Sequence, residues 1–182
     1  MVSRNQIIGR KSSWQRTRPT ARMLVGAIII ALIGLVGLTP KTIFGVQLIW
    51  PYAGLWGAVG WASAGLALRP MLLLCLFGIA QDVFFVGPIG NFMLVNLITY
   101  GVAATLGETL DVETDPVRAL MVSAVSMGAG FAALWALASG TADHVVRLGP
   151  LLGTYLITLL LFIPLSGLFR LGGRPGEKAG VA

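Results

Sequence analysis

The chain has 182 residues, of which 56% are hydrophobic and only 11% are charged. Its mean hydropathy is +0.85. Soluble domains carry roughly twice that fraction of charged residues, so the composition excludes an ordinary soluble enzyme or binding domain. The sequence predicts an integral membrane protein with one domain, long enough for about six spanning helices of ~20 residues.

The net charge is +6 and the isoelectric point is near 10.3, values that also occur in nucleic-acid-binding proteins. Here the charges cluster at the two ends of the chain, beside apolar segments. Attraction to anionic lipid and orientation in the bilayer explain this distribution, so no nucleic-acid partner is expected. The single Cys75 lies in an apolar run and cannot form an internal disulfide, which leaves the redox compartment open.

The first 22 residues are basic, contain no acidic residue and precede an apolar run. A small-residue cleavage site does not follow that run, and a twin-arginine pair is absent. We therefore interpret residues 1–22 as a retained cytoplasmic tail, with a mitochondrial presequence as the alternative. A Gly-rich, basic tail at residues 172–182 is expected to be flexible.

Six apolar segments lie between the two tails and predict one transmembrane domain over residues 23–171. Asp115-Pro116 is typical of a helix start, as N-cap and first-turn proline, and Pro164 is expected to kink the last segment. Arg69-Pro70 separates the second segment from the third. The segments are 23–38, 48–68, 71–86, 92–106, 117–139 and 148–171.

The distribution of basic residues predicts the orientation of this all-α domain. With six spans and a cytoplasmic N-terminus, eleven basic residues lie inside and two, Lys41 and Arg147, lie outside. This bias supports an even number of spans with both chain ends in the cytoplasm. The acidic loop at 108–115 then lies on the cytoplasmic side, with no role assigned. The inside set is Arg4, Arg10, Lys11, Arg16, Arg18, Arg22, Arg69, Arg118, Arg170, Arg174 and Lys178.

One stretch, Phe77–Asn91, carries an acidic residue inside an otherwise apolar segment. A carboxylate at membrane depth costs several kcal/mol unless it finds a partner or water, so Asp82 is a candidate site residue. The turn Gly87-Pro88-Ile89-Gly90-Asn91 predicts a hairpin that makes the third and fourth segments neighbours. Asp82 lies about five residues from the outer surface, which favours a polar anchor between the two segments over direct ligand binding.

Asn96 and Tyr100 lie four residues apart, on one face of the fourth segment. Asn96 follows the turn by about as many residues as Asp82 precedes it, so we expect the two side chains at similar depth. We predict that Asn96 or Tyr100 hydrogen-bonds the Asp82 carboxylate. The complete candidate set for an anchor, a pocket or a partner surface is Asp82, Gln81, Asn96, Tyr100, Gly87, Pro88 and Gly90.

Small residues mark the expected helix contacts, because association in lipid depends on close backbone approach. Packing within this chain and an interface with a partner, including a homodimer, both stay open. Trp50 and Tyr52 are expected in the aromatic belt at the outer interface, whereas Trp56 and Trp61 either fill the bundle or line a cavity. The small residues are Gly54, Gly57 and Gly60 in the second segment, Gly128 in the fifth, and Gly149 and Gly153 in the sixth.

Residues that carry enzyme chemistry are scarce in this sequence. His144 is the only histidine, and a lone loop histidine is typical of a solvated residue rather than a catalytic group or metal ligand. A Gly-rich phosphate loop, a His-Glu-x-x-His motif and a Gly-x-Ser-x-Gly elbow are all absent from the sequence. The sequence therefore predicts a protein that is not an enzyme and uses no cofactor or metal.

The middle of the chain resembles MreD, the bacterial rod shape-determining membrane protein family. That family has a Pro-containing entry to the second span, then Gly-x-x-x-Asp, Gly-x-x-Gly and an apolar helix with a tyrosine. Gln81 departs from the Leu or Met that many relatives have there, and the long basic N-terminus is unusual. The matching residues are Trp50-Pro51-Tyr52, Gly78-Ile79-Ala80-Gln81-Asp82, Gly87-Pro88-Ile89-Gly90 and Tyr100, within residues 48–110.

The resemblance implies a non-enzymatic scaffold of the elongasome, or Rod complex, in the bacterial inner membrane. It would bind MreC and, through it, MreB filaments, the RodA-type glycosyltransferase and its transpeptidase, and so support lateral peptidoglycan synthesis and rod shape. The family's fold is similar to that of the substrate-binding S components of energy-coupling-factor vitamin transporters. The alternative function is therefore small-molecule binding, in a pocket lined by Trp56, Trp61, Asp82 and Asn96.

Overall fold

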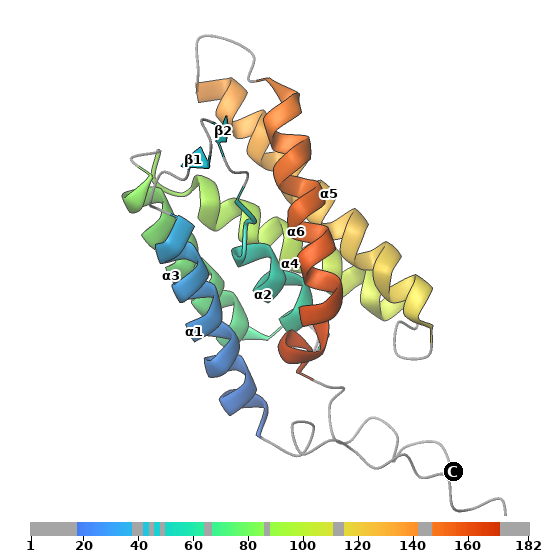
Figure 1. The fold of residues 1–182 in the computed structure, drawn as a ribbon. Helices are drawn as coiled ribbons and strands as arrows, with labels where there is room; N and C mark the ends of the chain where they lie inside the picture. The colour runs from blue at the N-terminus through green and yellow to red at the C-terminus, as the bar shows by residue number, and fades with distance from the viewer. Residues whose placement is uncertain are drawn as a thin grey trace, which may run out of the picture.

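The computed structural model describes residues 18–37, 42–43, 46–47, 50–63, 67–85, 88–110, 115–141 and 147–171. These residues form six helices, gathered into one bundle, and one short hairpin (Figure 1). The elements are α1 (Pro19–Gly37), β1 (Thr42–Ile43), β2 (Val46–Gln47), α2 (Gly54–Ala62), α3 (Leu68–Phe84), α4 (Asn91–Thr109), α5 (Pro116–Thr141) and α6 (Leu148–Phe169). The prediction of a helical protein is confirmed, with the addition of an antiparallel hairpin that pairs Thr42 with Gln47 and Ile43 with Val46.

The last three predicted segments agree with α4, α5 and α6 to within about three residues at each end. The start of α5 follows the predicted capping pattern, since the Val117 N–H donates to Asp115 Oδ1 at 2.8 Å and Pro116 is the first helical residue. Pro164 lies inside α6, which continues as a helix to Phe169. Boundaries taken from capping residues and apolar runs are therefore accurate in this half of the chain.

The first helix begins earlier than the sequence predicts. Because a proline fits the first helical position, α1 starts at Pro19 and includes the end of the predicted tail. Arg22 is only 5% exposed, and its Nη1 donates to the carbonyl oxygen of Leu171 at 3.2 Å. The Leu171 N–H donates in turn to Ser63 Oγ at 3.1 Å. The start of α1, the end of α2 and the end of α6 therefore meet at one end of the bundle.

The second predicted segment forms a much shorter helix than a membrane-spanning one. At about 1.5 Å per residue, the 9 residues of α2 extend about 14 Å, less than half of a hydrocarbon core about 30 Å thick. Pro51 disfavours helical geometry at the residue before it, which keeps the entry to α2 non-helical. Every residue of α2 is buried, because α1, α3, α4, α5 and α6 all contact it.

The position predicted for the break between the second and third segments is wrong. Arg69 and Pro70 lie within the first turn of α3, which begins at Leu68 after the extended residue Ala67. A proline is tolerated there because the first backbone N–H groups of a helix have no helical partner. The chain therefore starts a new helix just before Arg69-Pro70 rather than after it.

Three helices, α1, α5 and α6, are long enough and apolar enough to cross a membrane. Their outward side chains are large and apolar at helical spacing, as shown by the exposed Leu148, Leu152, Leu156 and Leu160 of α6. A soluble protein rarely exposes a continuous apolar surface of this extent. These features mark the chain as a membrane protein.

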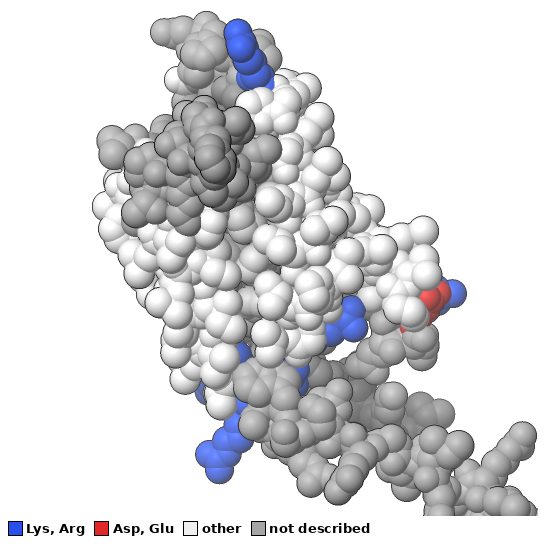
Figure 2. All heavy atoms as spheres, in the orientation of Figure 1, with Lys and Arg blue, Asp and Glu red and all other residues white. Residues whose placement is uncertain are grey.

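Charged side chains lie at the two ends of the bundle (Figure 2). The face that Figure 2 shows has a broad charge-free area between them. The start of α1 and the end of α6, which Arg18 and Arg170 adjoin in the sequence, lie at one end of the bundle, and the start of α6, which Arg147 precedes, lies at the opposite end (Figure 1). A charge-free surface between charged ends is typical of a protein surrounded by lipid.

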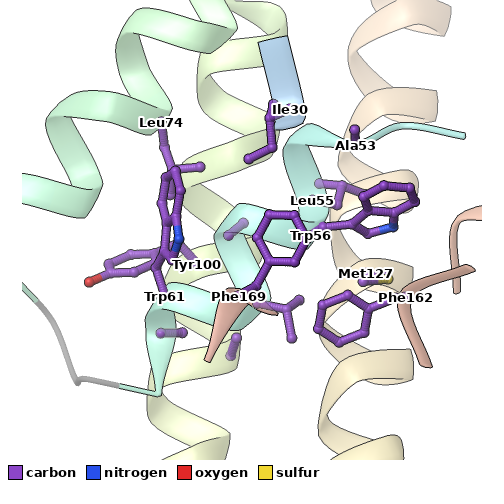
Figure 3. Packing of buried hydrophobic residues seen from close by; sticks show 14 of the residues in the cluster. Ile30, Ala53, Leu55, Trp56, Trp61, Leu74, Tyr100, Met127, Phe162 and Phe169 are labelled. Carbon is purple, nitrogen blue, oxygen red and sulfur yellow. The ribbon is translucent and has the colours of Figure 1, made fainter. Parts of the chain in front are cut away.

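The core is built around α2, where large aromatic side chains meet (Figure 3). Trp56 and Trp61 are both buried and fill the bundle, as favoured from the sequence. The Trp56 ring lies 6.2 Å from that of Phe169, and its Nε1 donates to the Thr158 carbonyl oxygen at 2.8 Å. Helix α6 is therefore held against α2 by ring packing at its end and by a hydrogen bond near its middle.

Candidate functional site

Asp82 binds the start of the next helix. Its side chain is only 1% exposed, and its Oδ2 accepts a hydrogen bond from the Gly90 N–H at 2.7 Å. Oδ1 accepts a second from the Phe92 N–H at 2.9 Å. The first N–H groups of a helix lack helical partners, and Gly90, the N-cap of α4, has no side chain to supply one. Asp82 of α3 therefore caps α4 from outside, where the positive end of the helix dipole also favours its charge.

Gly78 lies one turn before Asp82 on the same face of α3. A Cβ atom at Gly78 would overlap the backbone N and Cα of Met93, and would lie 2.8 Å from the carbonyl carbon of Phe92. The two helices touch backbone to backbone at this point, which only a glycine permits. Close approach at Gly78 is what brings the α4 amides within reach of the Asp82 carboxylate.

Gly90 completes this arrangement from the α4 side. Its φ angle is +106°, in the left-handed region that residues with a side chain rarely adopt. This conformation directs the chain from the turn into α4 while the Gly90 N–H donates to Asp82. We call Gly78 and Asp82, with the backbone of Gly90, Phe92 and Met93, the α3–α4 junction.

A second polar group lies beside the junction, centred on Tyr52. The Tyr52 Oη lies 2.9 Å from Gln81 Oε1 and 2.9 Å from Asn96 Oδ1. The Asn96 Nδ2 donates to the Leu74 carbonyl oxygen at 3.3 Å, and the Tyr52 N–H donates to Thr158 Oγ1 at 2.9 Å. We call these five residues the Tyr52 network; it joins the entry to α2 with α3, α4 and α6.

The orientation of the amide groups follows from counting protons. Because Asn96 donates to Leu74, its Oδ1 faces Tyr52 as an acceptor. The phenol has one proton and can donate it to one acceptor at a time. Donation to Asn96 leaves the Gln81 amide to turn its NH₂ group toward the Tyr52 oxygen, since the two ends of a Gln amide have the same shape. In this arrangement the buried polar atoms that meet at Tyr52 are all paired.

The predicted partners of Asp82 are not the ones found. Its hydrogen bonds come from backbone N–H groups, whereas Asn96 bonds Tyr52 and Leu74. Tyr100 Oη accepts a hydrogen bond from the Ala67 N–H at 2.9 Å, at the start of α3. Asn96 and Tyr100 do share one buried face of α4, but they bond different parts of the bundle. The prediction from equal depth considered only side chains. The free backbone N–H groups at the start of α4 bind the carboxylate instead.

Tyr52 and Trp50, expected in the interfacial belt, also bond within the bundle. The Tyr52 hydroxyl reaches two buried or half-buried amides, and its ring lies 5.4 Å from that of Phe92. Trp50 is half-buried, and its Nε1 donates to the Ile33 carbonyl oxygen of α1 at 3.0 Å. Both residues therefore connect elements of the bundle. Pro88 is exposed beside the junction, and Gly87 lies outside the described residues.

The predicted packing glycines divide into two groups. Gly54, Gly57 and Gly60 are buried in α2, and an added Cβ would meet Asn96 Oδ1 at 3.0 Å, Ile30 Cδ1 at 2.7 Å and Phe169 respectively. Gly128 and Gly149 are different, because no described atom of another element lies within 4 Å of their Cβ positions. The described part of the chain therefore supplies no packing partner at these two positions, and an interface with a partner there stays a prediction. Gly153 is half-buried in α6.

Further close contacts were not predicted from the sequence. Among them, Gly26 of α1 faces Phe169 and Trp61, and Gly130 of α5 faces Thr99 of α4. Neither glycine was among the small residues expected to mark helix contacts. A single glycine in an apolar helix is compatible with a close helix contact, but many other glycines of this chain lie in the same kind of sequence.

A cavity among the described residues lies between α5 and α6, away from the Tyr52 network. Its volume is about 390 Å³, and none of the four residues suggested for a ligand pocket lines it. Among the described residues, no group of three or more His, Cys, Asp or Glu side chains is placed to hold a metal ion. His144 lies outside that part of the chain, and Cys75 is a half-buried free thiol.

Comparison of the chain with family models, characterised proteins and solved structures gave no match. The resemblance described above therefore stands on its short motif alone.

Proposed function

We propose that this chain is a non-enzymatic, MreD-type scaffold of the bacterial elongasome, which binds MreC in the inner membrane. The observation that carries the proposal is the α3–α4 junction. Gly78, Asp82 and Gly90, which match the family pattern, form one contact between neighbouring helices. Tyr52 and Tyr100, from the same pattern, also bond between elements. A motif whose residues hold helices together supports a structural role.

The proposed topology has six crossings with both chain ends in the cytoplasm. Successive helices run in alternate directions through the bundle, and the described ends of the chain lie together (Figure 1). The short α2 crosses with the help of the non-helical residues beside it. Non-helical backbone is tolerated at membrane depth where protein buries it, and α2 is surrounded by the other five helices.

The scaffold is favoured over the small-molecule transporter component for a specific reason. The residues suggested for a ligand pocket are almost fully buried: Trp56 and Asp82 are each 1% exposed, and Trp61 and Asn96 are each 0% exposed. Asp82 and Asn96 use their polar atoms on partners within the chain. A ligand at this position would have to displace those hydrogen bonds.

Depletion of the protein from a rod-shaped bacterium that carries it tests the proposal. We expect round cells, restored to rods by the wild-type gene but not by Asp82→Ala, and co-purification of MreC with the wild-type protein. Asp115→Ala is the matched control, because Asp115 also caps a helix but is only half-buried. Rod-shaped cells that require a vitamin, with that vitamin bound to the purified protein, would support the transporter function instead.

A further inference from the structure

The cavity between α5 and α6 is partly open to the surroundings of the bundle. Of the residues that line it, Phe131 is buried, while Leu148 and Leu152 are exposed. The Tyr155 hydroxyl donates to the Ala124 carbonyl oxygen at 3.2 Å and joins the two helices at the inner end of the cavity. Beyond this point the helices leave a space that no described side chain fills.

The dimensions of the cavity suit a single hydrocarbon chain. Along α5 it extends from Gly128 to Trp135, seven residues or about 10 Å at the helical rise, which is about one third of the hydrocarbon core. Its volume of about 390 Å³ corresponds to roughly 13 groups the size of a water molecule, at about 30 Å³ each. Its lining is aromatic and aliphatic, without a charged side chain among the residues around it.

A positively charged residue adjoins the cavity along the chain. Arg147 is exposed and directly precedes Leu148, which lines the cavity. It is the N-cap of α6, whose start lies at the end of the bundle opposite the start of α1 (Figure 1). An apolar cavity next to a cation is complementary to a phospholipid, whose chain is apolar and whose phosphate is anionic.

We propose that the α5–α6 cavity binds one acyl chain of an anionic phospholipid, with the lipid phosphate paired to Arg147. A transmembrane helix of another protein, or a second copy of this chain, fits the observations less well. Neither accounts for a cavity with the volume of one hydrocarbon chain, next to Arg147. The site is separate from the α3–α4 junction and from the Tyr52 network.

Trp135 lies in the cavity and provides the test. The full-length protein is reconstituted in nanodiscs of phosphatidylcholine that contain a small fraction of brominated lipid, either phosphatidylglycerol or phosphatidylcholine. Quenching of Trp135, obtained as the difference between wild type and Trp135→Phe, reports brominated chains in the cavity. We expect about fivefold stronger occupancy by phosphatidylglycerol, the effect of one basic residue near the membrane surface. Arg147→Gln should abolish this preference.

Gly128→Leu separates the cavity from the general lipid surface. Because no described atom of another element lies within 4 Å of the Gly128 Cβ position, a leucine should enter the cavity without disturbing the fold and should remove most of the Trp135 quenching. Gly101→Leu on α4, another glycine with open space at its Cβ position, should leave the quenching unchanged. Equal quenching by the two lipids in the wild type would overturn the proposal. A second result would also overturn it: Trp135 is quenched by neither lipid, and the Leu152→Cys variant forms disulfide-linked dimers. That result would place a second copy of the chain in the cavity.

Discussion

The α3–α4 junction and the α5–α6 pair are both helical hairpins, and each contains glycines and a buried or half-buried tyrosine contact nearby. In the junction the helices meet backbone to backbone, and a buried carboxylate caps one helix from the other. In the α5–α6 pair, Gly128 and Gly149 face open space, and a cavity of about 390 Å³ separates parts of the helices. The same residue type therefore marks both a backbone-to-backbone contact and open space in this bundle.

This difference has a physical cause. Without a hydrophobic force between helices in lipid, close packing requires small residues that coincide with a polar interaction or with a fitting side chain on the neighbour. Gly78 has both, because Asp82 lies one turn away and α4 presents free amides. Gly128 has neither among the described residues, so lipid can take the place of a neighbouring helix there.

The largest difference is expected from adding one methyl group in each region. Gly78→Ala should lower the free energy of unfolding by about 3 kcal/mol, because the new Cβ overlaps the α4 backbone, which cannot move aside as a side chain can. Gly128→Ala should leave stability unchanged or raise it by up to about 1 kcal/mol, through helix propensity. Unfolding in sodium dodecyl sulfate from detergent micelles measures both. Equal effects of the two variants would show that the junction is not the tighter contact.

The next largest effect is expected from the capping carboxylates. Asp82→Ala should cost about 2–3 kcal/mol, because it leaves two N–H groups without their charged acceptor at a buried position. Asp115→Ala removes a half-buried cap of α5 and should cost about 1 kcal/mol. The loss of stability from Asp82→Asn should lie between these two values, because one amide oxygen replaces two carboxylate oxygens. The same unfolding assay measures all three, and a greater loss from Asp115→Ala would contradict this order.

The smallest effect is expected from removing one hydroxyl in each region. Tyr52→Phe should cost about 1–2 kcal/mol, because Asn96 and Gln81 both lose their partner at buried or half-buried positions. Tyr155→Phe removes a single half-buried hydrogen bond to the Ala124 carbonyl and should cost less than about 1 kcal/mol. Thermal aggregation midpoints of the purified variants can rank them. A larger loss of stability from Tyr155→Phe than from Tyr52→Phe would contradict the conclusion that the main polar network is centred on Tyr52.

The sequence predicted several features of this structure for sound physical reasons. Apolar runs and caps located α4, α5 and α6 closely, because the helix ends there depend on local residues such as Asp115 and Pro116. The same runs overestimated α2, whose length depends on burial by five other helices. A buried helix and a spanning helix have similar composition, so their lengths cannot be told apart by hydropathy alone.

The candidate site shows the same limit. Asp82 stood out because a carboxylate is rare in such a segment, but its partners are backbone amides, which every sequence contains. Tyr52 looked like an interfacial aromatic because it lies beside Trp50 and Pro51 near a segment end. Its place among Gln81, Asn96 and Thr158 depends on how α2, α3, α4 and α6 come together, which residue spacing does not specify.

Hydrogen exchange of the backbone amides at the start of α4 tests the central claim, that Asp82 of α3 holds α4 in place. A hydrogen bond to a charged group is worth about 1.5–3 kcal/mol, which corresponds to roughly 10- to 100-fold slower exchange. We predict that Asp82→Ala speeds exchange at Gly90 and Phe92 by that factor and leaves residues 124–135 of α5 unchanged. Unchanged exchange at Gly90 and Phe92 in the variant would contradict the account.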